Sequence, residues 1–172
     1  TVENVTQIAQ QTIVNKETEF FEINLKDFDL SQFPSLKISR ELFSTLQKHH
    51  LLVLGAGINV DKYILAKYIA AVLAGKLASG KTQASVKQWY GNSDSGSIYS
   101  ELEESEYSKI FILSNASPQS FLTYDLPDLQ RAVAARNHFI VVTTELPFHS
   151  WNLTDESRIW WRDLSETDVE GN

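Results

Sequence analysis

Residues 49–73 read HHLLVLGAGINVDKYILAKYIAAVL, and this stretch decides the fold. The apolar run 51–54, stopped by a glycine, is typical of a strand covered on both faces of a sheet. From residue 62 onward the apolar residues recur at helical spacing, and Asp61 is placed to cap that helix. A strand, a turn containing Gly55 and Gly57, and a helix with Lys62 near its start form the layout of a phosphate-binding loop.

The rest of the chain alternates in the same way. Helices are predicted from Ser39 to 49, at 97–106 and at 126–136, and further strands at 86–90, 109–114, 139–144 and 158–163. This alternation predicts an α/β domain of three layers, in which helices cover both faces of a mainly parallel five-stranded sheet. We assign 1–37 to a partly ordered N-terminal extension, 38–165 to the α/β domain and 166–172 to an acidic linker or tail.

Composition narrows the function classes. A chain of 172 residues is long enough for one well-cored domain, and its net charge of −7 argues against a non-specific nucleic-acid binder. It has no cysteine and only four scattered histidines, so we expect neither disulfides nor a metal site. No apolar run is long enough to span a membrane and no signal peptide is present, so we expect a cytoplasmic protein. Because the sequence contains no methionine, we expect it to be a piece of a longer chain.

Residues 38–165 resemble the core of a P-loop NTPase, in particular the AAA and STAND branches of signalling and defence proteins. The order of the elements carries the resemblance, together with two segments. Residues 62–67 are similar to the family's Lys-Thr-Thr-Leu-Ala-Lys, and 139–145 are similar to its sensor strand. The resemblance implies that strand 51–54 lies between the fourth and the last strand, with the Walker A loop at 51–63 and the Walker B strand at 109–115. It implies a polar sensor at Thr143, Thr144 and Glu145.

The sequence departs from the family pattern at the positions that bind phosphate and magnesium and that activate water. Asp61 stands where a glycine precedes the Walker lysine, Tyr63 stands where a hydroxyl holds Mg²⁺, and Ser114-Asn115 replace the Walker B acid. Phosphoryl transfer depends on positioning and on metal and cationic charge, so these losses imply a pseudo-enzyme. We therefore expect no cofactor, and a protein partner or flanking domains of the same chain instead. Asp61 is expected to outcompete phosphate for the helix N-terminus, with Lys62 turned outward or paired to Asp61.

Two alternatives remain open. Residues 75–82 match the Walker A pattern letter for letter through Gly75, Gly80, Lys81 and Thr82, which would make an active NTPase with ATP or GTP and magnesium. That interpretation requires a strand at 69–74 and a helix from 83 onward. Residues 55–59, Gly-Ala-Gly-Ile-Asn, also resemble the opening of sirtuin-like NAD-consuming domains, as 142–144 resemble their later threonine pair.

Overall fold

A computed structural model describes residues 20–22, 36–79, 84–90, 96–103, 108–118 and 126–169. Its elements in chain order are β1 (Phe20–Glu22), α2 (Leu36–His49), β2 (Leu51–Gly55), α3 (Lys62–Ser79), β3 (Ala84–Tyr90), α4 (Gly96–Glu103), β4 (Ser108–Ser114), α5 (Leu126–Ala135), β5 (Phe139–Thr144), η4 (Phe148–Trp151), η5 (Asp155–Trp160), β6 (Trp161–Asp163) and α6 (Glu166–Val169), where η marks a 3₁₀ helix.

The strands form one sheet in the order β1-β3-β4-β5-β2-β6. All neighbours are parallel except β1, which pairs antiparallel with β3. Strand β2 therefore lies between β5 and β6, as the P-loop resemblance predicted. The predicted count of five strands is wrong. Four strands have five to seven residues, and a three-residue strand, β1 or β6, lies at each edge. Because β1 pairs with β3, β3 is not an edge strand, although it carries Lys87 and Gln88.

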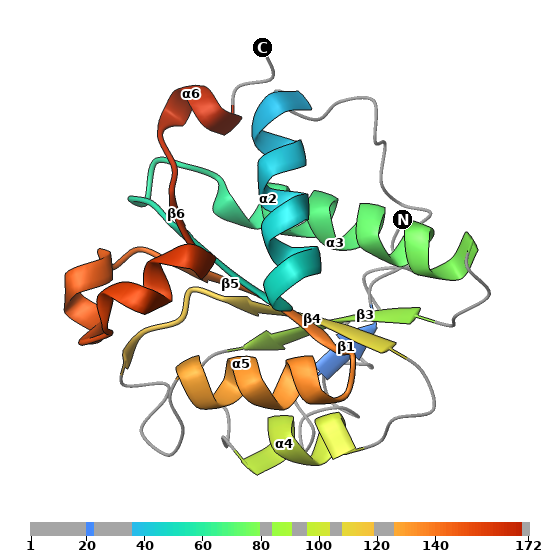
Figure 1. Cartoon of the computed structure of the whole chain (residues 1–172). Coiled ribbons are helices and arrows are strands. Elements are labelled where there is room, and N and C mark those ends of the chain that lie inside the picture. Colours follow the sequence, from blue (N-terminus) through green and yellow to red (C-terminus); the bar gives the residue numbers. More distant parts are fainter. Residues whose placement is uncertain are drawn as a thin grey trace, which may run out of the picture.

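Helices cover both faces of the sheet, which confirms the predicted three layers (Figure 1). Strand β2 contributes to the hydrophobic core on both faces of the sheet, because its side chains alternate between the faces. Leu51 and Val53 belong to the core that includes α5 residues, whereas Leu52 and Leu54 belong to the core that includes α2 and α3 residues. All four are fully buried. A strand buried on both faces reads as a continuous apolar run, which is why residues 51–54 were recognisable in the sequence.

Several element boundaries differ from the predictions. Helix α2 begins at Leu36, three residues before the predicted start at Ser39, so Ser39 lies inside the helix. The last strand is shorter than predicted, because residues 155–160 wind into η5 and only Trp161–Asp163 pair with β2. The 3₁₀ turns bury Ser157 and Trp160, which an extended chain would not place on the same side.

The two chain ends also take part in the fold where the structure describes them. Residues 20–22, assigned to the extension 1–37, pair with β3 through Phe20↔Trp89 and the next two positions. Glu166–Val169, assigned to the acidic tail, form a helical turn whose Asp168 carboxylate accepts the Ser165 amide at 2.8 Å. Across the described ranges, no helix has the length and apolar character that a membrane span requires.

Candidate functional site

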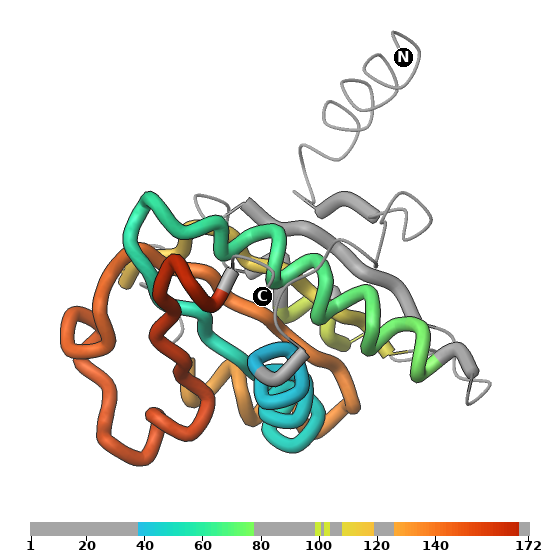
Figure 2. Tube along the Cα trace, turned by 90° about the horizontal axis from the view of Figure 1, so that it is seen from above, coloured from blue at the N-terminus to red at the C-terminus, as the bar shows by residue number. Residues whose placement is uncertain are grey.

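A cleft of about 390 Å³ lies beyond the carboxyl ends of β2, β4 and β5. In Figures 1 and 2 the loop after β2 and the segments after β5 extend from the same side of the sheet, where ligands of parallel α/β sheets bind. Ten residues line the cleft: Ile58, Asn59, Val60, Asp61, Lys62, Tyr63, Ser114, Asn115, Thr143 and Glu145. Seven of them were singled out from the sequence. Gly55, Gly57 and Thr144 are not among the lining residues.

The Lys62 side chain is turned onto its own loop. Its ammonium donates to the Gly57 carbonyl oxygen at 3.1 Å and to the Val60 carbonyl oxygen at 3.3 Å, and the residue is only 8% exposed. The prediction that Lys62 points outward or pairs with Asp61 is therefore wrong. The adjacent Asp61 carboxylate is engaged as a helix cap, and the ammonium binds carbonyl oxygens of the loop instead.

The amides of this loop are also satisfied from within. The Val60 N–H donates to the Gly57 oxygen at 3.1 Å, and the Lys62 N–H donates to the Val60 oxygen at 2.9 Å. The Asp61 carboxylate accepts the Ile64 N–H at 3.1 Å, which confirms its predicted cap. In a phosphate-binding loop, amides at such positions point at the anion. Here the three amides described above donate to acceptors within the loop itself.

The two glycines of the loop differ in what they permit. A Cβ added at Gly55 would lie 2.9 Å from Trp161 Nε1 and 3.0 Å from Trp161 Cζ2, whereas one at Gly57 would meet nothing within 4 Å. Trp161 is held in place by its indole N–H, which donates to the Asp163 carboxylate at 2.9 Å. Gly55 is thus needed for the approach of an indole ring. Its predicted role, a bare backbone for an anion, is not what the local packing requires.

The residues predicted as Walker B and sensor positions are joined by hydrogen bonds. The Asn115 amide donates to Thr143 Oγ1 at 2.9 Å, and the Ala116 amide donates to the Thr143 carbonyl oxygen at 2.7 Å. Thr144 Oγ1 donates to the Ala116 oxygen at 2.7 Å and accepts the Leu146 amide at 3.1 Å. Both threonines are buried. They fasten the turn after β4 to the end of β5, a structural role that sequence reasoning missed.

The literal Walker match at 75–82 has the wrong surroundings. Residues 69–74 are helical within α3, which continues through Gly75 to Ser79, and the next element is strand β3. A phosphate loop requires the reverse order, a strand before it and a helix after it. Ile69 and Leu73 are buried under the helix against the sheet, which explains why this apolar segment is a helix. Gly80, Lys81 and Thr82 lie outside the described residues.

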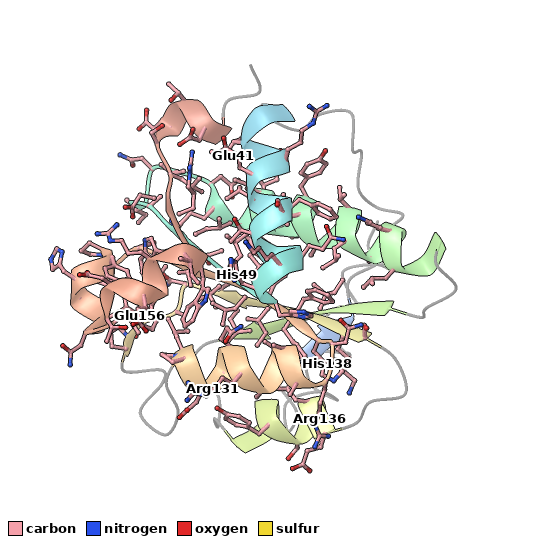
Figure 3. All side chains as sticks on the ribbon, in the orientation of Figure 1. Glu41, His49, Arg131, Arg136, His138 and Glu156 are labelled. Carbon is pink, nitrogen blue, oxygen red and sulfur yellow. The ribbon has the colours of Figure 1, made fainter. Side chains whose placement is uncertain are left out.

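Sequence reasoning also missed a buried histidine at the opposite end of the sheet. His138 Nδ1 accepts the Lys109 amide at 2.9 Å, and Nε2 carries the proton donated to the Leu102 carbonyl oxygen at 3.0 Å. Burial is the main reason why the pKa of His138 lies below its usual value. Arg136, next to it in Figure 3, donates to the Glu103 oxygen at 2.8 Å. His138 thus fastens the end of α4 to β4, and Arg136 fastens it to the end of α5.

No group of three or more metal-ligating side chains occurs among the residues that the structure describes. Sequence comparison gives no relatives, since no family model and no curated protein matches the chain. The fold does match solved structures. PCH-2 of C. elegans is 14% identical with a TM-score of 0.53, and the match covers 86% of this chain and 48% of that protein. A katanin structure, from work on katanin self-assembly, is 11% identical with a TM-score of 0.51, covering 88% of this chain and 58% of that one.

These two proteins belong to the AAA+ ATPases, so the chain has the α/β fold of AAA+ P-loop domains. At such identities the likeness shows the fold alone, and the chain spans only 48% and 58% of the two proteins it resembles. The sirtuin-like alternative is not supported by the sheet order. A dinucleotide-binding fold places its first glycine-bearing strand beside the next strand in sequence, whereas β2 lies between β5 and β6.

Proposed function

We propose that this AAA-like domain is a pseudo-NTPase, a regulatory or protein-interaction domain of a larger signalling or defence-type protein that does not hydrolyse nucleotides. The observation that carries the proposal is the position of the Lys62 ammonium on the Gly57 and Val60 carbonyl oxygens. A lysine that cradles phosphate has to leave those acceptors first. Leaving them breaks two hydrogen bonds of the ammonium, which costs free energy, although each oxygen keeps a backbone N–H donor.

The chemistry of the cleft supports the same proposal. Tyr63 and Ser114-Asn115 line the cleft at the positions where an NTPase holds Mg²⁺ and activates water, and none of them offers a carboxylate. Asp61 and Glu145 do line the cleft, and their charge opposes a triphosphate. Without a metal ligand at the Walker B position, the charge of the transition state is not neutralised.

Nucleotide binding provides the first test. Calorimetry with ATP and GTP, each with magnesium, should give no affinity tighter than about millimolar, which is about −4 kcal/mol. Asp61→Asn keeps a cap acceptor but removes a charge, so it should raise any measured ATP affinity by about two- to fivefold. Glu156→Gln, an exposed position on η5, should leave the affinity unchanged. A micromolar affinity of the unmodified protein would overturn the proposal.

Turnover provides the second test. Phosphate release by the purified protein should not exceed that of buffer, and Lys62→Ala and Lys81→Ala should behave like the parent. Turnover lost in the Lys62 variant would show a working loop at 55–63, and turnover lost in the Lys81 variant would revive the motif at 75–82. Nicotinamide release from NAD, measured in parallel, would restore the sirtuin-like interpretation.

A further inference from the structure

An apolar pocket of about 120 Å³ lies between α2 and α3, which cover the same face of the sheet (Figure 1). Six side chains from the two helices line it: Ser39, Arg40, Phe43, Tyr68, Ile69 and Val72. An engineered cavity of about 150 Å³ holds a benzene molecule, so this pocket has room for one branched aliphatic side chain. It shares no lining residue with the cleft beyond β2, β4 and β5 and is therefore a separate site.

The Ser39 hydroxyl at this pocket lacks a hydrogen bond. Ser39 is only 6% exposed, and its Oγ has no partner in the part of the chain that the structure describes. Thr45, on the same helix, donates to the Glu41 carbonyl oxygen at 3.0 Å, a bond back along the helix that Ser39 does not make. A buried hydroxyl without a partner costs free energy, and each such group calls for an explanation. An acceptor atom on a ligand in the pocket would supply the missing partner.

The helices around the pocket are basic, although the chain as a whole is acidic. Helices α2 and α3 contain six lysine and arginine residues and one carboxylate, Glu41, in a chain of net charge −7. Glu41, labelled on α2 in Figure 3, pairs with Arg162 at 3.2 Å. Arg40 is exposed and forms no ion pair with any described residue, and Lys76 Nζ lies 5.3 Å from the centroid of the Phe43 ring. The pocket is thus an apolar hollow flanked by cations, which complements an apolar group that has negative charge beside it.

We propose that this pocket docks a short acidic segment of a partner protein through one branched aliphatic side chain. The side chain fills the space between Phe43, Tyr68 and Val72. The Ser39 hydroxyl donates to a carbonyl oxygen of the segment, and a carboxylate next to the apolar residue pairs with Arg40. A nucleic acid would use the cations but would leave the apolar walls without a contact. Docking here is independent of hydrolysis at the cleft, so ATP calorimetry and phosphate release test the proposed function separately.

The test uses three matched peptides and three variants of the whole chain. Acetyl-Gly-Asp-Leu-Asp-Gly-amide is titrated in while backbone amide shifts are followed by NMR. One twin has alanine in place of leucine, and the other has asparagine in place of both aspartates. Ser39→Ala and Arg40→Gln change the pocket. Arg131→Gln removes the same charge from an exposed position on α5, which covers the opposite face of the sheet.

We expect shifts at 39–43 and 68–72 with the leucine peptide. The alanine twin should bind about tenfold more weakly, because it buries less apolar surface. The asparagine twin should bind about two- to fivefold more weakly, as expected for solvent-accessible ion pairs, and Arg40→Gln should have a similar effect. Arg131→Gln should leave binding unchanged. No shifts around the pocket, or equal weakening by Arg40→Gln and Arg131→Gln, overturns the inference.

Ser39→Ala separates a role in binding from a role in the fold. The variant loses a buried hydroxyl that has no partner, so its melting temperature should equal or exceed that of the parent. It should nevertheless bind the leucine peptide about three- to tenfold more weakly. A lower melting temperature with unchanged binding would assign the hydroxyl to the fold and overturn the inference. A ten-nucleotide deoxythymidine strand that shifts the same amides at lower concentration than the peptide would also overturn it, in favour of a nucleic-acid site.

Discussion

Single atoms decide what the residues of the loop at 55–62 can do. The family's glycine pattern was interpreted as backbone left bare for an anion, yet Gly55 is constrained by Trp161 and Gly57 by nothing nearby. Lys62 was singled out from its place in the sequence, and its ammonium turned out to bind the loop itself. The same residue types can therefore serve packing and loop closure as well as catalysis.

Replacing Gly55 by alanine should destabilise the protein by about 1–3 kcal/mol, because the added methyl group would overlap the Trp161 indole. The matched substitution Gly57→Ala should change the free energy of unfolding by less than about 0.5 kcal/mol, since its Cβ enters open space. Urea denaturation followed by tryptophan fluorescence measures both. Equal effects of the two substitutions would contradict the packing role of Gly55.

His138 should make stability depend on pH. Burial lowers the pKa of His138 in the folded protein from the usual 6.5. Below that pH the unfolded chain therefore binds more protons at this residue than the folded protein does. Stability should thus be fully present above about pH 6.5 and decline as the pH falls toward the folded-state pKa. His49, whose pKa is lowered by burial and by Lys48, contributes in the same direction.

The measurement for His138 is the free energy of unfolding between pH 7.5 and 5. His138→Gln keeps a donor and an acceptor for the Leu102 oxygen and the Lys109 amide, so the comparison rests on the slope with pH and not on absolute stability. The variant should show a shallower slope than the parent. His149→Gln, at an exposed position on η4, should keep the parent's slope, and a parental slope in the His138 variant would refute the assignment.

At the scale of elements, the turn after β4 depends on β5. Thr144→Val keeps the shape of the side chain but leaves the buried Ala116 oxygen and the Leu146 amide without their partner, at a cost of about 1–3 kcal/mol. Thr45, on α2, makes a comparable bond to the Glu41 oxygen where solvent can replace it. Thr45→Val should therefore cost less than about 0.5 kcal/mol in thermal unfolding. Similar losses for both threonines would mean that the hydroxyl of Thr144 is not needed for the turn.

At the scale of the whole molecule, the short strand β1 protects the edge of the sheet. Its three residues pair with Trp89, Gln88 and Lys87 of the seven-residue strand β3. A chain that lacks residues 1–22 should expose this edge and self-associate, because unpaired N–H and C=O groups are a template for another strand. A chain that lacks only residues 1–19 retains β1 and should stay as dispersed as the parent in light scattering. Identical scattering of the two truncations would contradict the protective role.

The sequence pattern by itself determined the three layers, whereas the place of β2 in the sheet was predicted from the resemblance to P-loop NTPases. Short apolar runs such as 110–113 and 139–142 are typical of strands buried on both faces, and helical spacing between them favours a parallel sheet. Because the carboxyl ends of such strands meet and the resemblance places the Walker and sensor positions there, seven lining residues of the cleft could be named in advance. The layers need only local periodicity and chain connectivity, which the sequence contains.

Tertiary structure alone decided the rest. Some features depend on distances between segments that are far apart in the sequence: the contact of Trp161 with Gly55, the histidine that joins α4 to β4, and the pairing of β1 with β3. The direction of the Lys62 ammonium depends on competition between hydrogen-bond acceptors. A hydrogen bond forms with whichever acceptor the fold brings within about 3 Å, and residue spacing does not encode that choice. The motif at 75–82 shows the converse, since its letters match a phosphate loop while packing against the sheet makes its first half a helix.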